Sequence, residues 1–542
     1  MKSRVMPLLA ALGLLTLALI WWEIWREPIW AVDDLYFGKR SLNEAGHLDW
    51  GTLLTQIPND LLVRNGRIAD IFGELIFATG NGKSIIVVAL LLATHVAFFT
   101  AADRLVANTI GRTPRSSVRI FLGILAACFP FLLLWRQPAI AGSTLLFMSA
   151  TVGYFGGVIY IGAIITLSAS VAHREFSRIR SAVILGLVIL GSLHHEVIGL
   201  MVAAWWATML VVTDFRHVAR RNKIIVISSI VLSLARFALP GMWQRSGKVH
   251  FGFAWPETSG PLGDHVHQVL RYVGYASHLA IEILVVYWPF VLIFFVAAAA
   301  LIYRAQQETA RDGWSRVIPP AIVICTLAAI GFALRLHQRI PADRNDAMGF
   351  YHLVTSRSFM AFIVAVFVLV LAFAASWPLR RRLGAVYALL ALTAGASAIP
   401  AALDTVAARP TFFVAVMVLL APTVVMAIWL DHSDITKPVR LGTVAVAIVL
   451  TIVVSIQADR QVVRYHHDNA AVWRNIEAQI LAVQAGERTT FELPKRLPHP
   501  HYLPDYIGTS VNAKFYIIEY YHLPVSTQVY SPPTAESTAA NE

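Results

Sequence analysis

SAVILGLVILGSLHHEVIGLMVAAWWATMLVVT, residues 181–213, is an apolar run whose only ionisable side chains are His194, His195 and Glu196 at its centre. Basic residues flank the run on both sides, at Arg174, Arg178, Arg180, Arg216, Arg220, Arg221 and Lys223. Short basic loops of membrane proteins lie in the cytoplasm, so both ends of the run are expected on that side. We therefore predict two short helices, over 181–193 and 197–213, that meet at the His-His-Glu triplet.

The composition of the chain places this hairpin in an all-α polytopic membrane protein. Of its 542 residues, 57% are hydrophobic and 14% are charged, with a mean hydropathy of +0.63. A soluble domain is about 25% charged. Apolar stretches of about 18 or more residues, long enough to cross a bilayer, recur along most of the chain. Cys128 and Cys325 both lie in apolar runs, so we expect no disulfide and no cysteine metal site.

The loop charges orient a bundle of about thirteen predicted spans. The spans are 6–22, 84–102, 119–135, 142–170, 181–193, 197–213, 224–240, 279–303, 317–335, 356–377, 384–402, 411–430 and 441–457. The N-terminus is expected in the cytoplasm, and 1–22 is interpreted as a retained span rather than a cleaved signal peptide. We expect a transmembrane domain over 1–457, a small extracytoplasmic segment over 458–530 and a disordered tail over 531–542.

The first outer loop, 23–83, begins with an acidic pair, Asp33 and Asp34. Two carboxylates just outside the bilayer suit general-base or metal-binding chemistry at the membrane surface. The alternative is that they cap the short amphipathic helix that follows, because Asp is common at helix N-caps. No cofactor follows from the sequence, although the pair is compatible with a divalent cation such as Mg²⁺ or Mn²⁺.

The same loop contains a second pattern, an amphipathic helix along the membrane surface. Its apolar residues repeat at helical spacing, at Leu61, Leu62, Ile68, Ile71, Phe72, Leu75 and Ile76. Arg67, Asp70 and Glu74 share another face. These charges are interpreted either as substrate-binding groups or as an ordinary solvated helix face.

The triplet His194-His195-Glu196 lies within the depth of the membrane in this topology. Ionisable groups there are costly unless they pair or face a cavity, which makes them functional candidates. The alternative is a hydrated hairpin tip that satisfies the helix ends. Adjacent histidines do not converge on a metal, because neighbouring side chains on a helix diverge.

Arginines in two other outer loops are candidate phosphate ligands. Loop 336–355 contains Arg339 and Arg344, although short outer loops normally avoid arginine. Loop 241–278 contains Arg245, just after a predicted turn at Pro240-Gly241. A guanidinium grips phosphate through two parallel hydrogen bonds. In the alternative interpretation, the arginines of loop 336–355 pair locally with Asp343 and Asp346.

These features together resemble the GT-C superfamily of membrane glycosyltransferases. The likeness rests on Asp33-Asp34, Asn65-Gly66-Arg67, the His-Glu pair at a membrane hairpin, Leu239-Pro240-Gly241 with Arg245, and the pattern Asn512…Tyr520-Tyr521. A little-characterised bacterial group within the superfamily shares this arrangement. The likeness covers most of the chain as architecture, namely an N-terminal span, a long first outer loop with interfacial helices, many further spans and an extracytoplasmic tail.

The resemblance implies a sugar transferase of the bacterial inner membrane. The donor would be a polyprenyl-phosphate-linked sugar, and the acceptor an extracytoplasmic glycan, lipid or protein. Asp33 or Asp34 would be the general base, with neither favoured. Arg67, Arg245, Arg339 and Arg344 would stabilise the departing polyprenyl phosphate, and His195 and Glu196 complete the expected substrate-binding set, in which Glu196 orients an arginine or the acceptor.

Two other classes of function fit the composition. A transporter or lipid flippase would use His194, His195 and Glu196 as a proton relay, and would not need an acidic pair in a long outer loop. A non-catalytic assembly protein of the cell envelope would tolerate loss of Asp33 and Asp34. The formal net charge of +12 does not indicate nucleic-acid binding, because the basic residues are scattered along the membrane edges.

Overall fold

The structure is a computed structural model that describes residues 2–29, 49–59, 61–62, 67–77, 79, 82–172, 174–239, 262–308, 314–341, 347–403, 411–431, 435–499, 507–509 and 513–530. Its α-helices are α1 Lys2–Trp25, α3 Trp50–Asn59, α4 Ala69–Phe77, α5 Lys83–Ile110, α6 Ser116–Arg136, α7 Pro138–Leu145, α8 Met148–Ser168, α9 Arg178–His194, α10 Glu196–Val212, α11 Arg220–Ala235, α13 Leu262–Val286, α14 Trp288–Glu308, α15 Ile318–His337, α16 Ala347–Val354, α17 Arg357–Ala375, α18 Gly384–Leu403, α19 Phe412–Asp431, α20 Lys437–Gln484 and α21 Ala513–Tyr520. Short 3₁₀ helices are η3 Arg236–Ala238, η4 Trp314–Val317, η5 Trp377–Leu379 and η8 Ile507–Thr509, and the strands are β1 Thr490–Glu492 and β2 Gln528–Tyr530.

The prediction of an all-α polytopic membrane protein is confirmed. Within the ranges given above, nine helices are long and apolar enough to cross a bilayer: α5, α6, α8, α14, α15, α17, α18, α19 and α20. Shorter apolar segments occur at Ala10–Trp25, Glu196–Val212 and Val273–Val286. The finer count of about thirteen spans stays a prediction.

Two predicted spans are each divided between two helices. Residues 279–303 fall in α13 and α14, which separate at Tyr287. Pro289 lies in the first turn of α14 and has no backbone N–H for a bond to the preceding turn, so a continuous helix is disfavoured here. Residues 142–170 fall in α7 and α8, which are separated by Leu146 and the extended residue Phe147.

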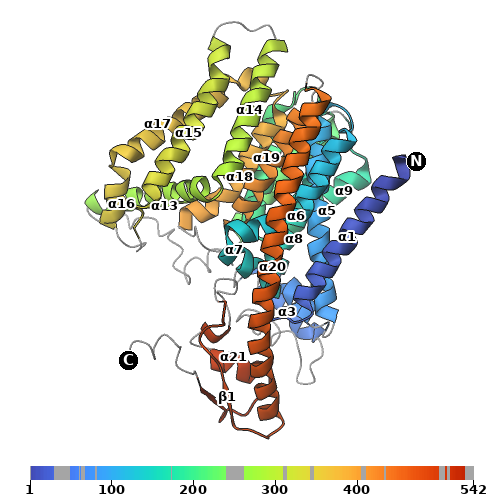
Figure 1. The fold of residues 1–542 in the computed structure, drawn as a ribbon, viewed down its shortest axis with the longest axis vertical. Helices are drawn as coiled ribbons and strands as arrows, with labels where there is room; N and C mark the ends of the chain where they lie inside the picture. Colours follow the sequence, from blue (N-terminus) through green and yellow to red (C-terminus); the bar gives the residue numbers. More distant parts are fainter. Residues whose placement is uncertain are drawn as a thin grey trace.

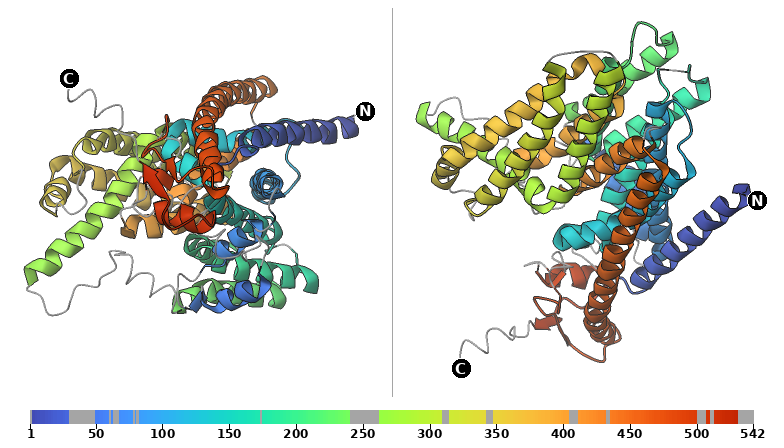
Figure 2. Two further views of the ribbon diagram at one scale, coloured as in Figure 1. Left: turned by 90° about the horizontal axis from the view of Figure 1, so that it is seen from below. Right: turned by 45° about the horizontal axis from the view of Figure 1, so that its top comes forward.

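The bundle is layered around α19 (Figure 1). In the most apolar stretch of α19, 89% of the residues are buried, compared with 72% for α8 and 33% for α17. α19 is therefore an inner helix. Helices α13, α15, α16 and α17 form a wing on one side of the bundle, with its own apolar cluster that includes Tyr275, Phe350 and Phe362. Figure 2 shows this wing extending away from α1 and α20.

α20 continues without a break well beyond the predicted span 441–457. At 1.5 Å per residue, its 48 residues extend about 72 Å, more than twice the apolar thickness of a bilayer. Its second half, from residue 458, forms a C-terminal cap with β1, η8, α21 and β2 below the bundle in Figure 1. β1 and β2 pair in parallel, with Phe491 opposite Val529.

The cap is attached to the chain just after α1. Nε2 of the buried His466 lies 2.9 Å from the backbone oxygen of Glu27, and the Glu27 carboxylate pairs with Arg474. His467 Nε2 lies 3.2 Å from Glu23 Oε1. The C-terminal cap therefore lies at the same end of the bundle as α3 and the end of α1 (Figure 1).

Candidate functional site: an ionic cluster at a helix break

The predicted break in the apolar run 181–213 is present in the structure. α9 ends at His194 and α10 begins at Glu196, with His195 extended at φ −151° and ψ 139°. Nδ1 of His195 accepts a hydrogen bond of 3.3 Å from the backbone N–H of Val197. His195 is thus the N-cap of α10, a position that needs a side-chain acceptor for an orphan N–H.

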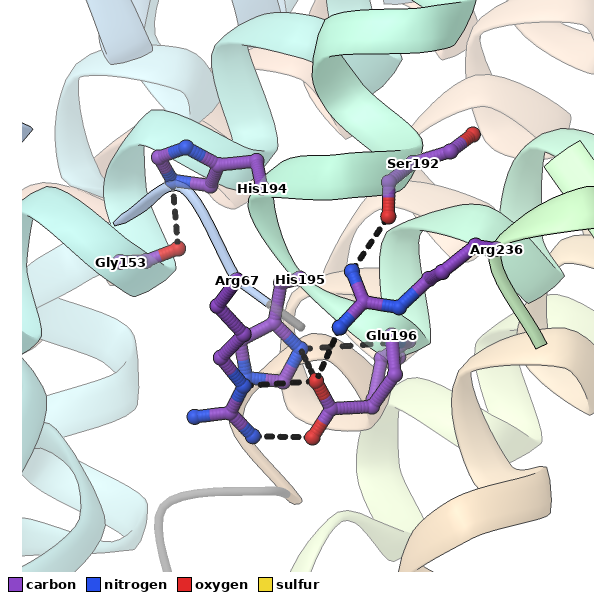
Figure 3. A network of polar contacts seen from close by, with 8 residues as sticks. Arg67, Gly153, Ser192, His194, His195, Glu196 and Arg236 are labelled. Atoms are coloured by element: carbon purple, nitrogen blue, oxygen red, sulfur yellow. Dashed lines mark hydrogen bonds and ion pairs between the residues drawn. The ribbon is translucent and has the colours of Figure 1, made fainter. Parts of the chain in front are cut away.

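Arg67 of the first loop binds the first residue of α10 (Figure 3). Its Nε donates to Glu196 Oε2 at 2.7 Å, and a second guanidinium nitrogen donates to Oε1. Two parallel bonds of this kind fix the plane of the carboxylate as well as its position. The backbone N–H of Ile68 donates to the oxygen of Leu193 at 3.0 Å, which holds the loop against the end of α9.

Arg236 approaches the same carboxylate from η3, at the end of α11. Its NH2 donates to Glu196 Oε2 at 3.1 Å, and its NH1 donates to the backbone oxygen of Ser192. Gly199 permits this approach, because a Cβ there would lie 3.2 Å from the oxygen of Ser233 and 3.8 Å from Arg236 Cδ. The three charged side chains Arg67, Glu196 and Arg236 are called the ionic cluster below.

The ionic cluster has one edge toward solvent. The side chain of Arg236 is 1% exposed, whereas those of Arg67 and Glu196 are 16% and 13% exposed. Two guanidiniums share the Glu196 carboxylate, and Asp70 adds a further attraction to Arg67. Burial lowers the pKa of Arg67, but attraction and hydrogen bonding to Glu196 outweigh it, so the pKa is raised overall and the guanidinium stays charged.

The two histidines hold the hairpin against α8 and α19. His194 Nε2 lies 3.0 Å from the oxygen of Val152 and 3.1 Å from that of Gly153, so the ring bonds to the backbone of α8. The ring of His195 packs between Tyr154 and Phe413, with centroid distances of 5.1 and 5.3 Å. Among the residues that the structure describes, no group of three or more His, Cys, Asp or Glu is placed to hold a metal ion.

The charges of the predicted amphipathic helix are not all on a solvated face. Glu74 is fully buried, and Asp70 is partly buried beside Arg67. The solvated-face interpretation is therefore wrong for Glu74. Only the second half of the predicted helix is present, as α4, and Arg67 and Ile68 precede its first residue. Ile68 and Ile71 pack against Leu53 of α3.

The other site residues expected from the sequence lie elsewhere or outside the described ranges. Asp33, Asp34, Arg245 and Arg344 are outside them, as are Asn65, Gly66 and Asn512. Arg339 follows α15 in the wing and is exposed, and no contact that the structure describes joins it to Glu196. Tyr520 and Tyr521 lie in the C-terminal cap, where the hydroxyl of Tyr521 donates to Glu477 at 3.2 Å.

Arg236 is the member of the ionic cluster that the sequence analysis missed. It falls inside the predicted span 224–240, where it was counted as part of an apolar segment. The signal was present, since an arginine within a membrane span is a functional candidate by default.

A cavity of about 800 Å³ lies at the other end of the bundle from the cap. It is bordered by the ends of α5, α10, α14 and α19 and by the start of α18. α10 therefore carries the ionic cluster at its first residue and borders this cavity near its last.

Comparisons with protein-family models, with curated proteins and with solved structures find no match to this chain.

Proposed function

We propose that the chain is a glycosyltransferase of the GT-C kind, which moves a sugar from a polyprenyl-phosphate donor to an extracytoplasmic acceptor of the cell envelope. The observation that carries the proposal is the ionic cluster. In this cluster Arg67, from the loop that contains the acidic pair, pairs with the carboxylate of Glu196 at a helix break within the bundle.

The cluster suits the leaving group of this reaction. Cleavage of the sugar–phosphate bond leaves negative charge on the polyprenyl phosphate, and preorganised positive charge stabilises a developing anion. The cluster contains two guanidiniums, and Arg67 is at its partly exposed edge. Glu196 and Arg236 act as positioning residues, because they fix the Arg67 guanidinium before the phosphate arrives.

The acidic pair would complete the reaction. Asp33 or Asp34 takes the proton of the acceptor hydroxyl as its oxygen bonds to the anomeric carbon, and the bond from that carbon to the phosphate oxygen breaks. A positioned base contributes roughly 10²–10⁴-fold to such a step. Arg245 and Arg344 stay in the proposal as further phosphate ligands. A divalent cation, Mg²⁺ or Mn²⁺, would add charge at the acidic pair.

The proposal places the protein in the bacterial inner membrane. The N-terminus would be cytoplasmic, and the first loop and the C-terminal cap extracytoplasmic. The attachment of the cap to the chain after α1 supports this arrangement, because it keeps both segments at one end of the bundle.

Transfer of radiolabelled sugar from a panel of polyprenyl-phosphate donors tests the proposal in membranes containing wild type, Asp33→Asn or Asp34→Asn. Transfer by wild type that one substitution abolishes at equal expression would identify the enzyme and its base. Activity that survives both substitutions would exclude the acidic pair from the mechanism.

The cavity of about 800 Å³ favours a second candidate, a transporter or lipid flippase. Transport needs a binding cavity open to one side of the membrane. Uptake or lipid translocation in proteoliposomes that Asp33→Asn and Asp34→Asn leave unchanged would support this candidate over the transferase.

A further inference from the structure

One exposed face of α20 changes from apolar to basic where the predicted span 441–457 ends. Residues three and four apart lie on the same face of a helix. The first part of this face is apolar and 48–60% exposed, at Val446, Val449, Val453 and Ile456. The second part is polar and also exposed, at Gln457, Arg460, Gln461 and Arg464. A ligand along this face therefore contacts an accessible apolar surface and two guanidiniums beside it.

Two hollows border the basic part of this face. The first, of about 540 Å³, is bordered by α20 from Val453 to Tyr465. The second, of about 510 Å³, lies between α20 and the end of α1, where Leu19 is 62% exposed. In Figure 1 and in Figure 2, α1 and α20 come together near the cap and separate toward the other end of the bundle. Arg460 and Arg464 line both hollows, so both guanidiniums are accessible to a ligand in either one.

The positive charge of the two arginines is only partly balanced. Among the described residues, neither guanidinium forms a hydrogen bond or an ion pair. Asp459 attracts the adjacent Arg460. Glu23 lines the second hollow, but it already pairs with Arg26 and with a histidine of the cap. No carboxylate of the described residues lines the first hollow, so its charge is positive and complementary to an anion.

The predicted span places the two arginines at the depth of the phosphate groups of a bilayer. α20 rises 1.5 Å per residue, so Arg460 and Arg464 lie about 5 and 11 Å beyond residue 457 along the helix axis. The polar layer of each leaflet is about 5–7 Å thick. A long arginine side chain can bend toward that layer while its stem stays on the helix surface. Both guanidiniums can therefore reach the phosphate of a lipid whose chains contact Val453 and Ile456.

We propose that this face of α20 binds one anionic phospholipid of the surrounding bilayer, with its phosphate at Arg460 and Arg464 and its acyl chains along Val453 and Ile456. Guanidiniums match phosphate in charge and in hydrogen-bond geometry. Residues four apart lie about 6 Å apart along a helix, a separation that one phosphate group can bridge. The apolar part alone would accept any lipid, whereas the two arginines select for net negative charge. The site shares no residue with the ionic cluster and does not depend on the transfer reaction.

Native mass spectrometry of the detergent-purified full chain tests this inference. Phosphatidylglycerol and phosphatidylcholine of matched chain length are titrated separately. We expect phosphatidylglycerol to bind roughly tenfold more tightly, because the choline group cancels the charge of its own phosphate beside the arginines. Glycerophosphoglycerol, the same headgroup without acyl chains, is added as a competitor and should not displace the lipid at equal concentration.

Three variants separate headgroup binding from a general effect of lost charge. Arg464→Gln should reduce the preference for phosphatidylglycerol, and the double variant Arg460→Gln with Arg464→Gln should abolish it. Arg488→Gln is the matched control, because Arg488 is an exposed arginine just after α20 that lines neither hollow. All the substituted side chains are exposed, so the melting temperatures should stay at that of the wild type.

Equal binding of the two lipids to the wild type would overturn the proposal, and this comparison needs no variant to fold. The proposal is also wrong if Arg464→Gln and Arg488→Gln reduce the preference to the same degree. Displacement of phosphatidylglycerol by an equal concentration of glycerophosphoglycerol would show that the site takes a free phosphate ester, and would overturn its assignment to a lipid.

Discussion

Arg67 Nε lies 2.7 Å from Glu196 Oε2, although 129 positions separate the two residues in the chain. The contact joins the first loop to the break between α9 and α10. The second half of the loop is thus held on the bundle by a two-point ion pair.

Glu196→Gln should destabilise the protein by about 3 kcal/mol, because it removes the carboxylate that pairs with both Arg67 and Arg236. Adding Arg236→Gln should recover part of this loss, since the buried charge of Arg236 is then removed as well. Thermal melting of the two single variants and the double variant measures the coupling. Additive losses would mean that Arg236 and Glu196 do not interact energetically.

Arg67→Lys tests whether the shape of the Arg67 guanidinium is needed or only its positive charge. Lysine keeps the positive charge but cannot form two parallel bonds to Glu196. If the proposed transferase is correct, transfer should fall roughly 10²–10³-fold with little change in melting temperature. Arg26→Lys is the control, because Arg26 is an exposed arginine just after α1 that pairs with Glu23. Equal loss in both variants would argue against a specific role for Arg67.

Gly156→Ala should disturb the hairpin. A Cβ at residue 156 of α8 would lie 3.0 Å from His194 Nε2 and 3.2 Å from its Cε1. Displacing this buried ring should cost about 1–3 kcal/mol, as overpacking of a core does. In α9, Gly186→Ala adds the same methyl group where nothing lies within 4 Å. Melting temperatures compare the two, and an equal effect would show that helix propensity, not the histidine contact, decides the result.

Attachment of the C-terminal cap should weaken in acid. Burial lowers the pKa of His466 to about 4 from its ordinary 6.5, and this residue and its partner Glu27 both lie outside the apolar spans. The docked state favours the neutral form of His466. The contribution of this residue to docking is therefore complete above about pH 6.5 and is lost as the pH falls toward about 4. The shift corresponds to a difference on the order of 3 kcal/mol.

Hydrogen exchange of α20 around residue 466, followed from about pH 7 to about pH 4, measures this loss after correction for the intrinsic exchange rate. His466→Gln should remove most of the pH dependence, since glutamine keeps a hydrogen-bonding group and does not titrate. Unchanged protection of the wild type over this range would contradict the prediction.

The sequence predicts those parts of the fold that follow from local charge and hydropathy. The break at His195 follows from basic residues on both sides of one apolar run, and the structure contains it. The division at Tyr287 was missed because hydropathy alone does not register the missing N–H of Pro289. The length of α20 was missed because its second half is polar, and polar residues there were interpreted as a separate cap.

The candidate site, too, was predicted only in part from the sequence. His195 and Glu196 were candidates from charge at membrane depth, and Arg67 from the amphipathic segment of the first outer loop. The structure brings the three together. Which side chains contact one another was not predictable from the sequence. It depends on how closely α11 packs against α10, and Gly199 permits that close packing. The N-cap contact of His195 with α10 agrees with the alternative interpretation of the triplet as a hairpin tip that satisfies the helix ends. Its predicted part in substrate binding stays a prediction.

The uninterrupted α20 joins the C-terminal cap to the opposite end of the bundle as a single element. α20 begins at Lys437, in one of the basic connections between spans, and its last turns lie in the C-terminal cap with β1 and α21. A helix of about 72 Å that pivots by about 5° at one end moves its other end by about 6 Å. A displacement of the cap would therefore be transmitted along α20 to Lys437, at the opposite end of the bundle.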